Sequence, residues 1–216
     1  MTPAEFQAAT DVSRETMARL EVYDALLRKW QRTINLVSAS TLDDAWRRHF
    51  LDSAQLAPLA AGAIWLDLGS GAGFPGMVLA ILGVGHVHLV ESDQRKAAFL
   101  REVAAHTAAP VTIHAVRIES LSRAEIGPKG ADVVTARALA PLDKLLDVAG
   151  ALVSDTGTLL FPTGRHSVAA ALTESRKSWR IDVTEIPSRT QSDSVILRLQ
   201  GIRHADGHTR SDPGDR

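Results

Sequence analysis

The sequence contains no cysteine, and this absence limits the chemistry that the protein can perform. It excludes disulfide bonds, thiolate metal sites and a cysteine nucleophile, and it fits a reducing compartment. An excess of charge of one sign is also missing, because the formal net charge is −1. No overall basic field therefore predicts binding to nucleic acid, although a local basic patch would be sufficient.

Long apolar runs are missing as well. No uninterrupted apolar segment approaches the length that crosses a bilayer. The first residues, from Met1 to Phe6, lack the basic start and the apolar core of a secretory signal peptide. We therefore expect a cytoplasmic protein without a membrane segment.

The chain is long and apolar enough to form a sizeable core. It has 216 residues, of which 45% are hydrophobic and 23% are charged. This suits one globular domain with a small appendage. The pattern predicts an N-terminal helical cap over residues 1–60, a main domain over 61–202 and a disordered tail over 203–216. Because no repeat or low-complexity linker separates cap and main domain, we expect them to pack together.

Helices are expected throughout the cap. Thr-Pro-Ala-Glu at residues 2–5 has the pattern of a capping box and predicts a helix that begins there. Apolar residues recur at helical spacing over residues 17–30 and predict a second helix after Ser13. A third helix is expected from about residue 41 to the residues before Pro58.

The main domain alternates strands with helices. Strands are predicted at residues 64–68, 87–91, 111–115, 131–136, 157–162, 181–186 and 194–199, and helices at 75–82, 94–106, 141–153 and 164–175. Such alternation predicts a mainly parallel sheet with right-handed crossovers. The last two strands follow each other without a helix, which predicts an antiparallel hairpin at one edge. The expected fold is therefore a Rossmann-like α/β fold with seven strands.

A glycine-rich turn at residues 69–76 is the centre of this pattern. An apolar run that contains Asp67 leads into glycines at positions 69, 71, 73 and 76, and a second apolar run follows. This order predicts a strand, a tight turn and a helix that begins at Pro75, since proline fits the first helical turn. A ligand can approach the bare backbone of such a turn and bind its N–H groups at the positive end of the helix.

Two kinds of ligand fit the glycine spacing. In one register, Gly71, Gly73 and Gly76 form the G-x-G-x-x-G pattern of dinucleotide sites, and Glu91 lies 20 residues after Gly71. In the other register, Asp67 precedes the glycines at 69, 71 and 73, which resembles motif I of class I S-adenosylmethionine-dependent methyltransferases. A carboxylate can face the cationic amino group of S-adenosylmethionine, whereas it would repel a pyrophosphate.

The position of Asp67 therefore favours the methyltransferase register. Glu91 serves either ligand, because both present ribose hydroxyls to an acid at the end of the second strand. For Asp67 alone, a second role is equally available, since aspartate often caps the backbone of the turn that follows it.

The resemblance becomes more specific beyond the general motif. Gly-Ser-Gly-Ala-Gly-Phe-Pro-Gly at residues 69–76 resembles the glycine motif of the bacterial 16S ribosomal RNA guanine-N7 methyltransferases, the glucose-inhibited division protein B family. Other similar segments are Lys29-Trp30, Ile34-Asn35-Leu36, Arg48-His49-Phe50-Leu51-Asp52-Ser53, Glu91-Ser92, Lys96, Phe99-Leu100-Arg101-Glu102-Val103 and Thr135-Ala136-Arg137-Ala138. Together the similarities extend over roughly residues 20 to 200.

This resemblance implies a cofactor, a substrate and a set of contacts. The cofactor is S-adenosylmethionine, and the reaction is methylation of guanine N7 in 16S ribosomal RNA, at position 527 in the family. The family's cofactor contacts correspond to Gly69, Phe74, Ile118, Glu119 and Arg137, and the general class I motif adds Asp67, Gly71, Gly73 and Glu91. The implied partner is 16S ribosomal RNA or the small ribosomal subunit, and we expect a monomer.

His49 and Arg137 are candidates for positioning the substrate. A lone histidine is by default a polar residue on a helix surface, and the resemblance adds a role in lining the site for His49. Arg137 follows an apolar strand at the ligand edge of the sheet, where it either lines the site or forms a salt bridge with Asp67 or Glu91. The Lys-Gly step of the family appears here as Thr163-Gly164-Arg165, so a lysine role is not carried over.

The chemistry needs no catalytic base, because guanine N7 carries a lone pair and no proton. Alignment with the methyl–sulfur bond and exclusion of water are expected to carry most of the rate. The histidines at 86, 88, 106 and 114 lack a metal-like spacing with acids, so no metal is expected. Residues 160–203 hold seven lysines and arginines against four acids, an excess that could contact phosphates. Two alternatives remain: a methyltransferase for a small molecule or protein, and a non-catalytic nucleotide-binding regulatory protein.

Overall fold

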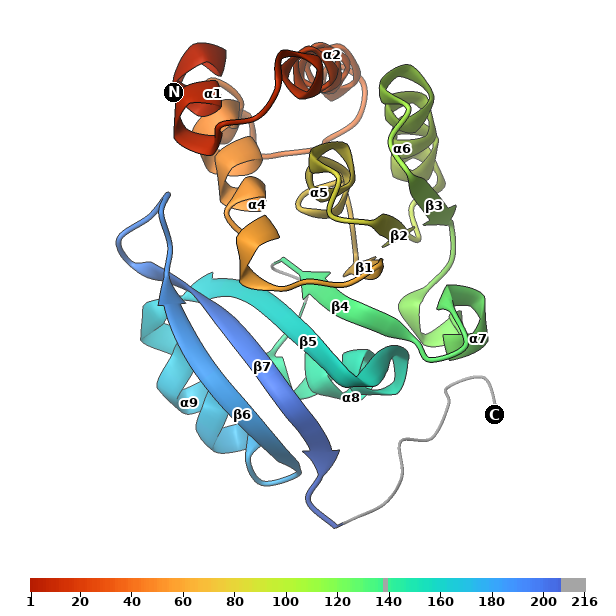
Figure 1. Cartoon of the computed structure of the whole chain (residues 1–216), viewed down its shortest axis with the longest axis vertical. Helices are drawn as coiled ribbons and strands as arrows, with labels where there is room; N and C mark the ends of the chain where they lie inside the picture. Colours follow the sequence, from red (N-terminus) through yellow and green to blue (C-terminus); the bar gives the residue numbers. More distant parts are fainter. Residues whose placement is uncertain (138–139, 207–216) are drawn as a thin grey trace.

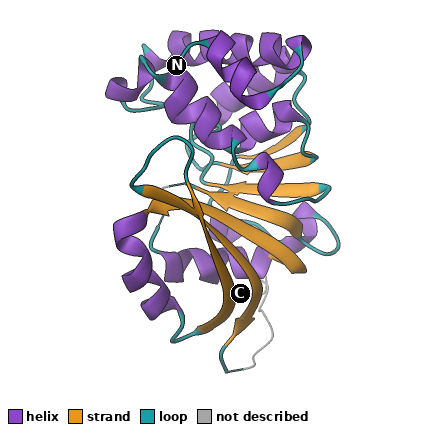
Figure 2. Cartoon of the chain, turned by 60° about the vertical axis from the view of Figure 1, so that its left-hand side comes forward, coloured by secondary structure: helices purple, strands orange, loops and turns teal. Residues whose placement is uncertain are grey.

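The fold is a twisted seven-stranded sheet between two layers of helices (Figures 1 and 2). The computed structural model describes residues 1–137 and 140–206. The strands are β1 (Ile64–Leu68), β2 (His86–Val90), β3 (Val111–His114), β4 (Ala131–Ala136), β5 (Val153–Gly164), β6 (Trp179–Pro187) and β7 (Ser194–His204). Their order is β3-β2-β1-β4-β5-β7-β6. Strands β1 to β5 are parallel, and β7 is antiparallel to both β5 and β6. The predicted parallel sheet with an antiparallel edge hairpin is confirmed.

Helices of the main domain cover both faces of the sheet. They are α5 (Gly76–Leu82), α6 (Gln94–Thr107), α7 (Arg123–Ile126), α8 (Leu142–Leu152) and α9 (Arg165–Ser175). Helix α5 and α6 share one hydrophobic core with the cap, whereas α8 and α9 pack in a second core against the opposite face. Among the residues that the structure describes, no helix is long and apolar enough to cross a membrane.

The cap is a series of helices that lies against α5 and α6 (Figure 1). It comprises α1 (Pro3–Thr10), α2 (Arg14–Gln31), α3 (Ala39–Leu42), a π-helix η1 (Trp46–Leu51), α4 (Asp52–Ala54) and a 3-10 turn η2 (Ala57–Leu59). The capping box is present, because the Thr2 hydroxyl accepts the Glu5 N–H and the Glu5 carboxylate accepts the Thr2 N–H.

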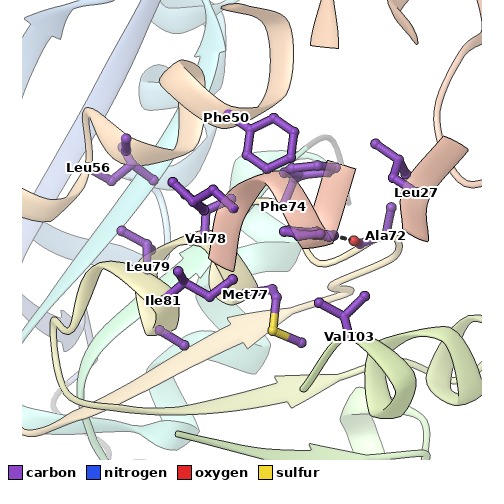
Figure 3. Packing of buried hydrophobic residues seen from close by; sticks show 14 of the residues in the cluster. Leu27, Phe50, Leu56, Ala72, Phe74, Met77, Val78, Leu79, Ile81 and Val103 are labelled. Atoms are coloured by element: carbon purple, nitrogen blue, oxygen red, sulfur yellow. Dashed lines mark hydrogen bonds between the residues drawn. The ribbon is translucent and has the colours of Figure 1, made fainter. Parts of the chain in front are cut away.

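Aromatic and aliphatic side chains pack the cap against the main domain in one hydrophobic core (Figure 3). Tyr23 of α2, Phe50 of η1 and Phe74 of the glycine turn are all buried, and their rings contact one another. Val78 and Leu79 of α5 lie in the same core. Burial of each such side chain stabilises the fold by about 1.5–3 kcal/mol. Because one core contains both regions, the cap holds the glycine turn in place.

The structure departs from the sequence-based expectations in several places. The third cap helix is broken: α3 ends at Leu42, and a separate π-helix starts at Trp46. Strand β5 begins at Val153, directly after α8, instead of at residue 157. Strand β7 runs to His204, where it pairs with Trp179, so the first two residues of the predicted tail are ordered sheet. The short helix α7 was not expected. Residues 207–216 of that tail lie outside the described residues.

Candidate active site

The glycine turn joins β1 to α5 at the carboxyl ends of the central strands. Gly69, Gly71 and Gly73 have φ values of 66°, 56° and 93°, a left-handed backbone that favours glycine. A Cβ built on Gly71 would meet nothing nearer than the Gly69 carbonyl oxygen at 3.8 Å. The space above Gly71 is therefore open, and the turn exposes bare backbone to a ligand.

Gly73 differs from Gly71 because its surroundings are filled by protein. A Cβ on Gly73 would lie 2.6 Å from the Tyr23 hydroxyl and 2.9 Å from Met77 Cβ. The Tyr23 hydroxyl also donates a hydrogen bond to the Ala72 carbonyl. Gly73 therefore lets the turn pack tightly against the cap, whereas Gly71 leaves room for a ligand.

Asp67 lies beneath the turn with 1% of its surface exposed. Its Oδ1 accepts the Thr135 hydroxyl at 2.7 Å, and its Oδ2 accepts the Gly76 N–H at 3.3 Å at the start of α5. Burial raises the pKa of this carboxyl to about 6, against the opposing effect of these hydrogen bonds. The geometry matches the role of a cap for the turn, and a direct contact between Asp67 and the cofactor remains a prediction.

Glu91 lies at the end of β2 and supports the turn from the other side. Its Oε2 accepts the Gly71 N–H at 2.8 Å, and its Oε1 accepts the Asp93 N–H at 2.7 Å. The side chain is largely buried, with 8% of the residue exposed. Each carboxylate oxygen keeps a lone pair after these bonds. Glu91 can therefore hold Gly71 and accept a ribose hydroxyl at the same time.

Phe74, His49 and Arg137 meet between the turn and the cap. The His49 ring stacks on Phe74, with centroids 5.0 Å apart, and the Arg137 guanidinium lies 5.5 Å from the centroid of the same ring. Phe74 is buried, with 3% of the residue exposed, and its contact with a cofactor remains a prediction. The structure thus brings together three predicted site residues that are far apart in the sequence.

The protonation state of His49 follows from its two partners. Arg137 donates to His49 Nδ1 at 3.3 Å, since a guanidinium can only donate. Nε2 therefore carries the proton and donates to the Thr41 hydroxyl at 2.8 Å. Burial, and then the positive charges of Arg137 and Arg48, lower the pKa of His49 to about 3. His49 is neutral at physiological pH and orients Arg137.

Ile118 and Glu119 lie on a 3-10 turn, η3 (Ile118–Ser120), that follows β3. Ile118 is partly buried against the second hydrophobic core, and Glu119 is exposed. The carboxyl end of β3 neighbours that of β2, which leads into Glu91. The two residues are thus at the edge of the sheet where a ligand on the turn would extend.

A cavity of about 680 Å³ opens on the other side of Arg137, at the carboxyl ends of β4 and β5. Its lining includes His49, Asp52 and Arg137, together with Thr163 and Gly164 from the segment that departs from the family pattern. Arg165, the third residue of that segment, is exposed at the start of α9. Sequence reasoning did not select Asp52, although it stands in the similar segment at residues 48–53.

Three of the histidines that the sequence left unassigned come together at the opposite edge of the sheet. His88 Nδ1 lies 2.8 Å from His114 Nε2, and the His86 ring contacts the His88 ring. Burial lowers the pKa of His88 to about 4. In the described residues, no group of three or more His, Cys, Asp or Glu side chains could hold a metal ion.

The sheet order and the glycine turn define the class of protein: the fold is that of class I S-adenosylmethionine-dependent methyltransferases. Similar solved structures include a predicted O-methyltransferase from Agrobacterium tumefaciens, with a TM-score of 0.53 and 22% identity over 72% of this chain and 79% of that chain. TYW2 from P. horikoshii in complex with MeSAdo has a TM-score of 0.55 and 13% identity over 71% and 63% of the two chains.

Sequence comparison narrows this class to a family. A family model described as GidB, rRNA small subunit methyltransferase G, matches residues 16–196. Curated relatives named ribosomal RNA small subunit methyltransferase G include one from Rhodospirillum centenum, 58% identical over 92% of this chain and 90% of that one. Another, from Paramagnetospirillum magneticum, is 52% identical over 94% of this chain and 97% of its own length. The chain belongs to the GidB family, which confirms the family inferred from its motifs.

Proposed function

We propose that the protein transfers the methyl group of S-adenosylmethionine to N7 of a guanine in 16S ribosomal RNA. Membership in the GidB family and the names of its relatives support methylation of small-subunit ribosomal RNA. The motif at residues 69–76 supports the choice of guanine N7. One structural observation carries the proposal: Arg137 lines the cavity of about 680 Å³, and its guanidinium lies 5.5 Å from the ring centroid of Phe74 in the glycine turn.

The residues of the turn fit the cofactor. The open space above Gly71 and its left-handed backbone allow close approach of a ligand, and Glu91 can accept hydrogen bonds from a ribose. When bound there, S-adenosylmethionine supplies an electrophilic methyl group. Asp67 supports the turn, because its hydrogen bond with the Gly76 N–H holds the start of α5 in place.

The residues beside the cavity position the acceptor and take no proton. N7 attacks through its own lone pair, so a general base is unnecessary. His49 stays neutral and holds the Arg137 guanidinium, which stands between the turn and the cavity. Fixing the acceptor next to the turn supplies the alignment on which the rate depends.

Methyl transfer to RNA gives a direct test. The purified protein is incubated with radiolabelled S-adenosylmethionine and either 16S ribosomal RNA or small subunits from a deletion strain. Label is expected in RNA, and cleavage chemistry specific for N7-methylguanosine is expected to map it to one guanine. Label in protein or in a small molecule would favour the alternative methyltransferase activity, and cofactor binding without transfer would favour a regulatory protein. We also propose that the enzyme acts in the cytoplasm and is a monomer. Size-exclusion chromatography with light scattering tests the oligomeric state.

A further inference from the structure

The cavity beside Arg137 has the size and lining of a site for one organic ring system. Apolar side chains such as Leu145, Phe161 and Leu197 line most of it, and Asp52 and Arg137 add charged groups. Ligand pockets of this kind have volumes of roughly 300–1,000 Å³ and few polar groups, which set the orientation of the ligand. A nucleobase fits this combination.

A basic depression continues from the mouth of the cavity. The two share Arg48, Ser188 and Gln191. Arg47 and Arg189 also line the depression, which gives it three arginines against one carboxylate. Arginines of this kind contact RNA phosphates and set the register of the strand without reading its sequence. A base inside the cavity would leave its phosphate near these arginines, the arrangement of a nucleotide turned out of its strand.

Asp52 presents one carboxylate oxygen without a hydrogen-bond donor. Its Oδ1 accepts the Gln55 side-chain amide at 3.0 Å and the Thr190 hydroxyl at 2.5 Å. The orientation of that amide is set, because Gln55 Oε1 accepts the Arg189 N–H at 2.8 Å. Oδ2 forms an ion pair with the Arg137 guanidinium at 3.6 Å, and within residues 1–137 and 140–206 no group donates a hydrogen bond to this oxygen. Oδ2 is thus available to a ligand in the cavity.

We propose that this cavity receives the target guanine turned out of the RNA, and that Asp52 Oδ2 accepts hydrogen bonds from its N1–H and 2-amino groups. The proposal rests on the proposed function and adds the residue that selects the base. Guanine presents two donors on this edge, which a carboxylate satisfies. Adenine presents the N1 acceptor there, so a carboxylate would repel it. Asp52 would therefore reject adenine as well as bind guanine.

The same contact favours the reaction itself. The N7 lone pair forms a bond to the methyl carbon while the carbon–sulfur bond breaks and its electron pair stays on sulfur. The purine becomes cationic, and no proton leaves or joins N7. Positive charge on the ring makes N1–H a stronger donor, so its hydrogen bond to Asp52 strengthens toward the transition state. An interaction that is stronger in the transition state than in the ground state raises kcat.

The experiment compares guanine with inosine at the target position of 16S ribosomal RNA, assembled into subunits and methylated by the full chain. Inosine lacks only the 2-amino group. For the wild-type protein, we expect kcat/KM to fall at least tenfold on inosine. For Asp52→Asn, the Gln55 and Thr190 donors hold the amide oxygen at the Oδ1 position, which turns the NH₂ toward the cavity. The amide hydrogens of the substituted side chain would then face the N1–H and 2-amino hydrogens of guanine. We therefore expect kcat/KM on guanine to fall at least 30-fold and the preference for guanine over inosine to disappear.

Thr190→Val is the matched control, because it removes a donor to the same carboxylate without changing its charge. We expect this variant to keep the preference for guanine. The proposal fails if the wild-type protein methylates inosine and guanine equally, if Asp52→Asn keeps the wild-type preference, or if Thr190→Val loses it completely. The wild-type comparison needs no variant, so misfolding of Asp52→Asn leaves it decisive. Absence of any wild-type methylation of guanine overturns the proposed function, and this proposal with it, whereas methylation without base preference overturns this proposal alone.

Discussion

The glycine turn and the cavity lie on two sides of Arg137, and their polar groups have different hydrogen-bond partners. On the glycine-turn side, both oxygens of Asp67 and both oxygens of Glu91 accept hydrogen bonds from the fold itself. On the cavity side, the hydrogen bonds of Arg137 are long, at 3.3 and 3.4 Å, and Asp52 Oδ2 accepts no hydrogen bond from the described residues and pairs with the Arg137 guanidinium at 3.6 Å. The carboxylates of the turn are thus satisfied within the protein, whereas polar groups of the cavity can still bind a ligand. Variants of the turn should therefore lose stability together with cofactor binding, whereas variants of the cavity should lose activity with little loss of stability.

Gly73→Ala is expected to have the largest effect on stability. The residue has φ 93°, and a Cβ would lie 2.6 Å from the Tyr23 hydroxyl. Left-handed strain and overpacking together are expected to lower the free energy of unfolding by about 3–4 kcal/mol. Gly83→Ala is the control, since Gly83 also has a positive φ but nothing lies within 4 Å of its Cβ position. Chemical denaturation should show a loss of about 1 kcal/mol there; equal losses would show that packing around Gly73 contributes nothing.

Asp67→Ala should destabilise the protein nearly as much. The substitution leaves the Thr135 hydroxyl and the Gly76 N–H buried without an acceptor. Two unsatisfied buried donors cost roughly 3 kcal/mol. Denaturation and the dissociation constant for S-adenosylmethionine are measured together at one temperature. A stable variant that has lost cofactor binding would show that Asp67 contacts the cofactor directly and would contradict the contrast between the two sides.

His49 should make the protein sensitive to acid. Its pKa is about 3 in the fold, below the ordinary value of 6.5, so the folded state binds fewer protons than the unfolded state between these values. Its stabilising contribution is present above pH 6.5 and is lost as the pH falls toward 3, by about 2 kcal/mol at pH 5. Chemical denaturation at pH 7 and pH 5 should show that the unfolding free energy of His49→Gln falls less between these two pH values than that of the wild type.

Asp67 titrates with the opposite sign. Its raised pKa, about 6, means that the folded state binds more protons than the unfolded state between about pH 4 and pH 6, so its contribution falls as the pH rises through this window. Asp67→Asn removes this effect. The unfolding free energy of this variant should therefore fall more steeply on acidification than that of the wild type. If His49→Gln and Asp67→Asn change the pH dependence in the same direction, the charge states assigned to the two sides are wrong.

Arg137→Lys should have the smallest effect on stability and a clear effect on activity. The guanidinium makes long hydrogen bonds and lies 5.5 Å from the centroid of the Phe74 ring, so the loss in unfolding free energy should be below about 1 kcal/mol. A lysine cannot reproduce the planar contact with Phe74 and His49. We expect methyl transfer to fall at least tenfold. A large loss of stability would show that Arg137 supports the fold in the way that Asp67 and Glu91 do, and would contradict this prediction.

Much of this architecture follows from local patterns. The capping box at residues 2–5, the strand at 64–68 and the antiparallel hairpin were predicted because each depends on nearby residues. The broken third cap helix was missed, since apolar periodicity does not distinguish one helix from two short ones with a turn between them. The early start of β5 was missed because its pairing with Ala131 of β4 is a long-range contact.

The sequence by itself determined the fold class and the register of the cofactor motif, because glycine spacing, Asp67 and the residues around them act over short distances along the chain. Tertiary structure alone decided how the polar groups are used. Asp67 is enclosed by Thr135 and Gly76, whereas Asp52 meets Thr190, 138 residues away in the chain, beside a cavity. Whether a carboxylate supports the backbone or awaits a ligand depends on which distant donors the fold brings to it.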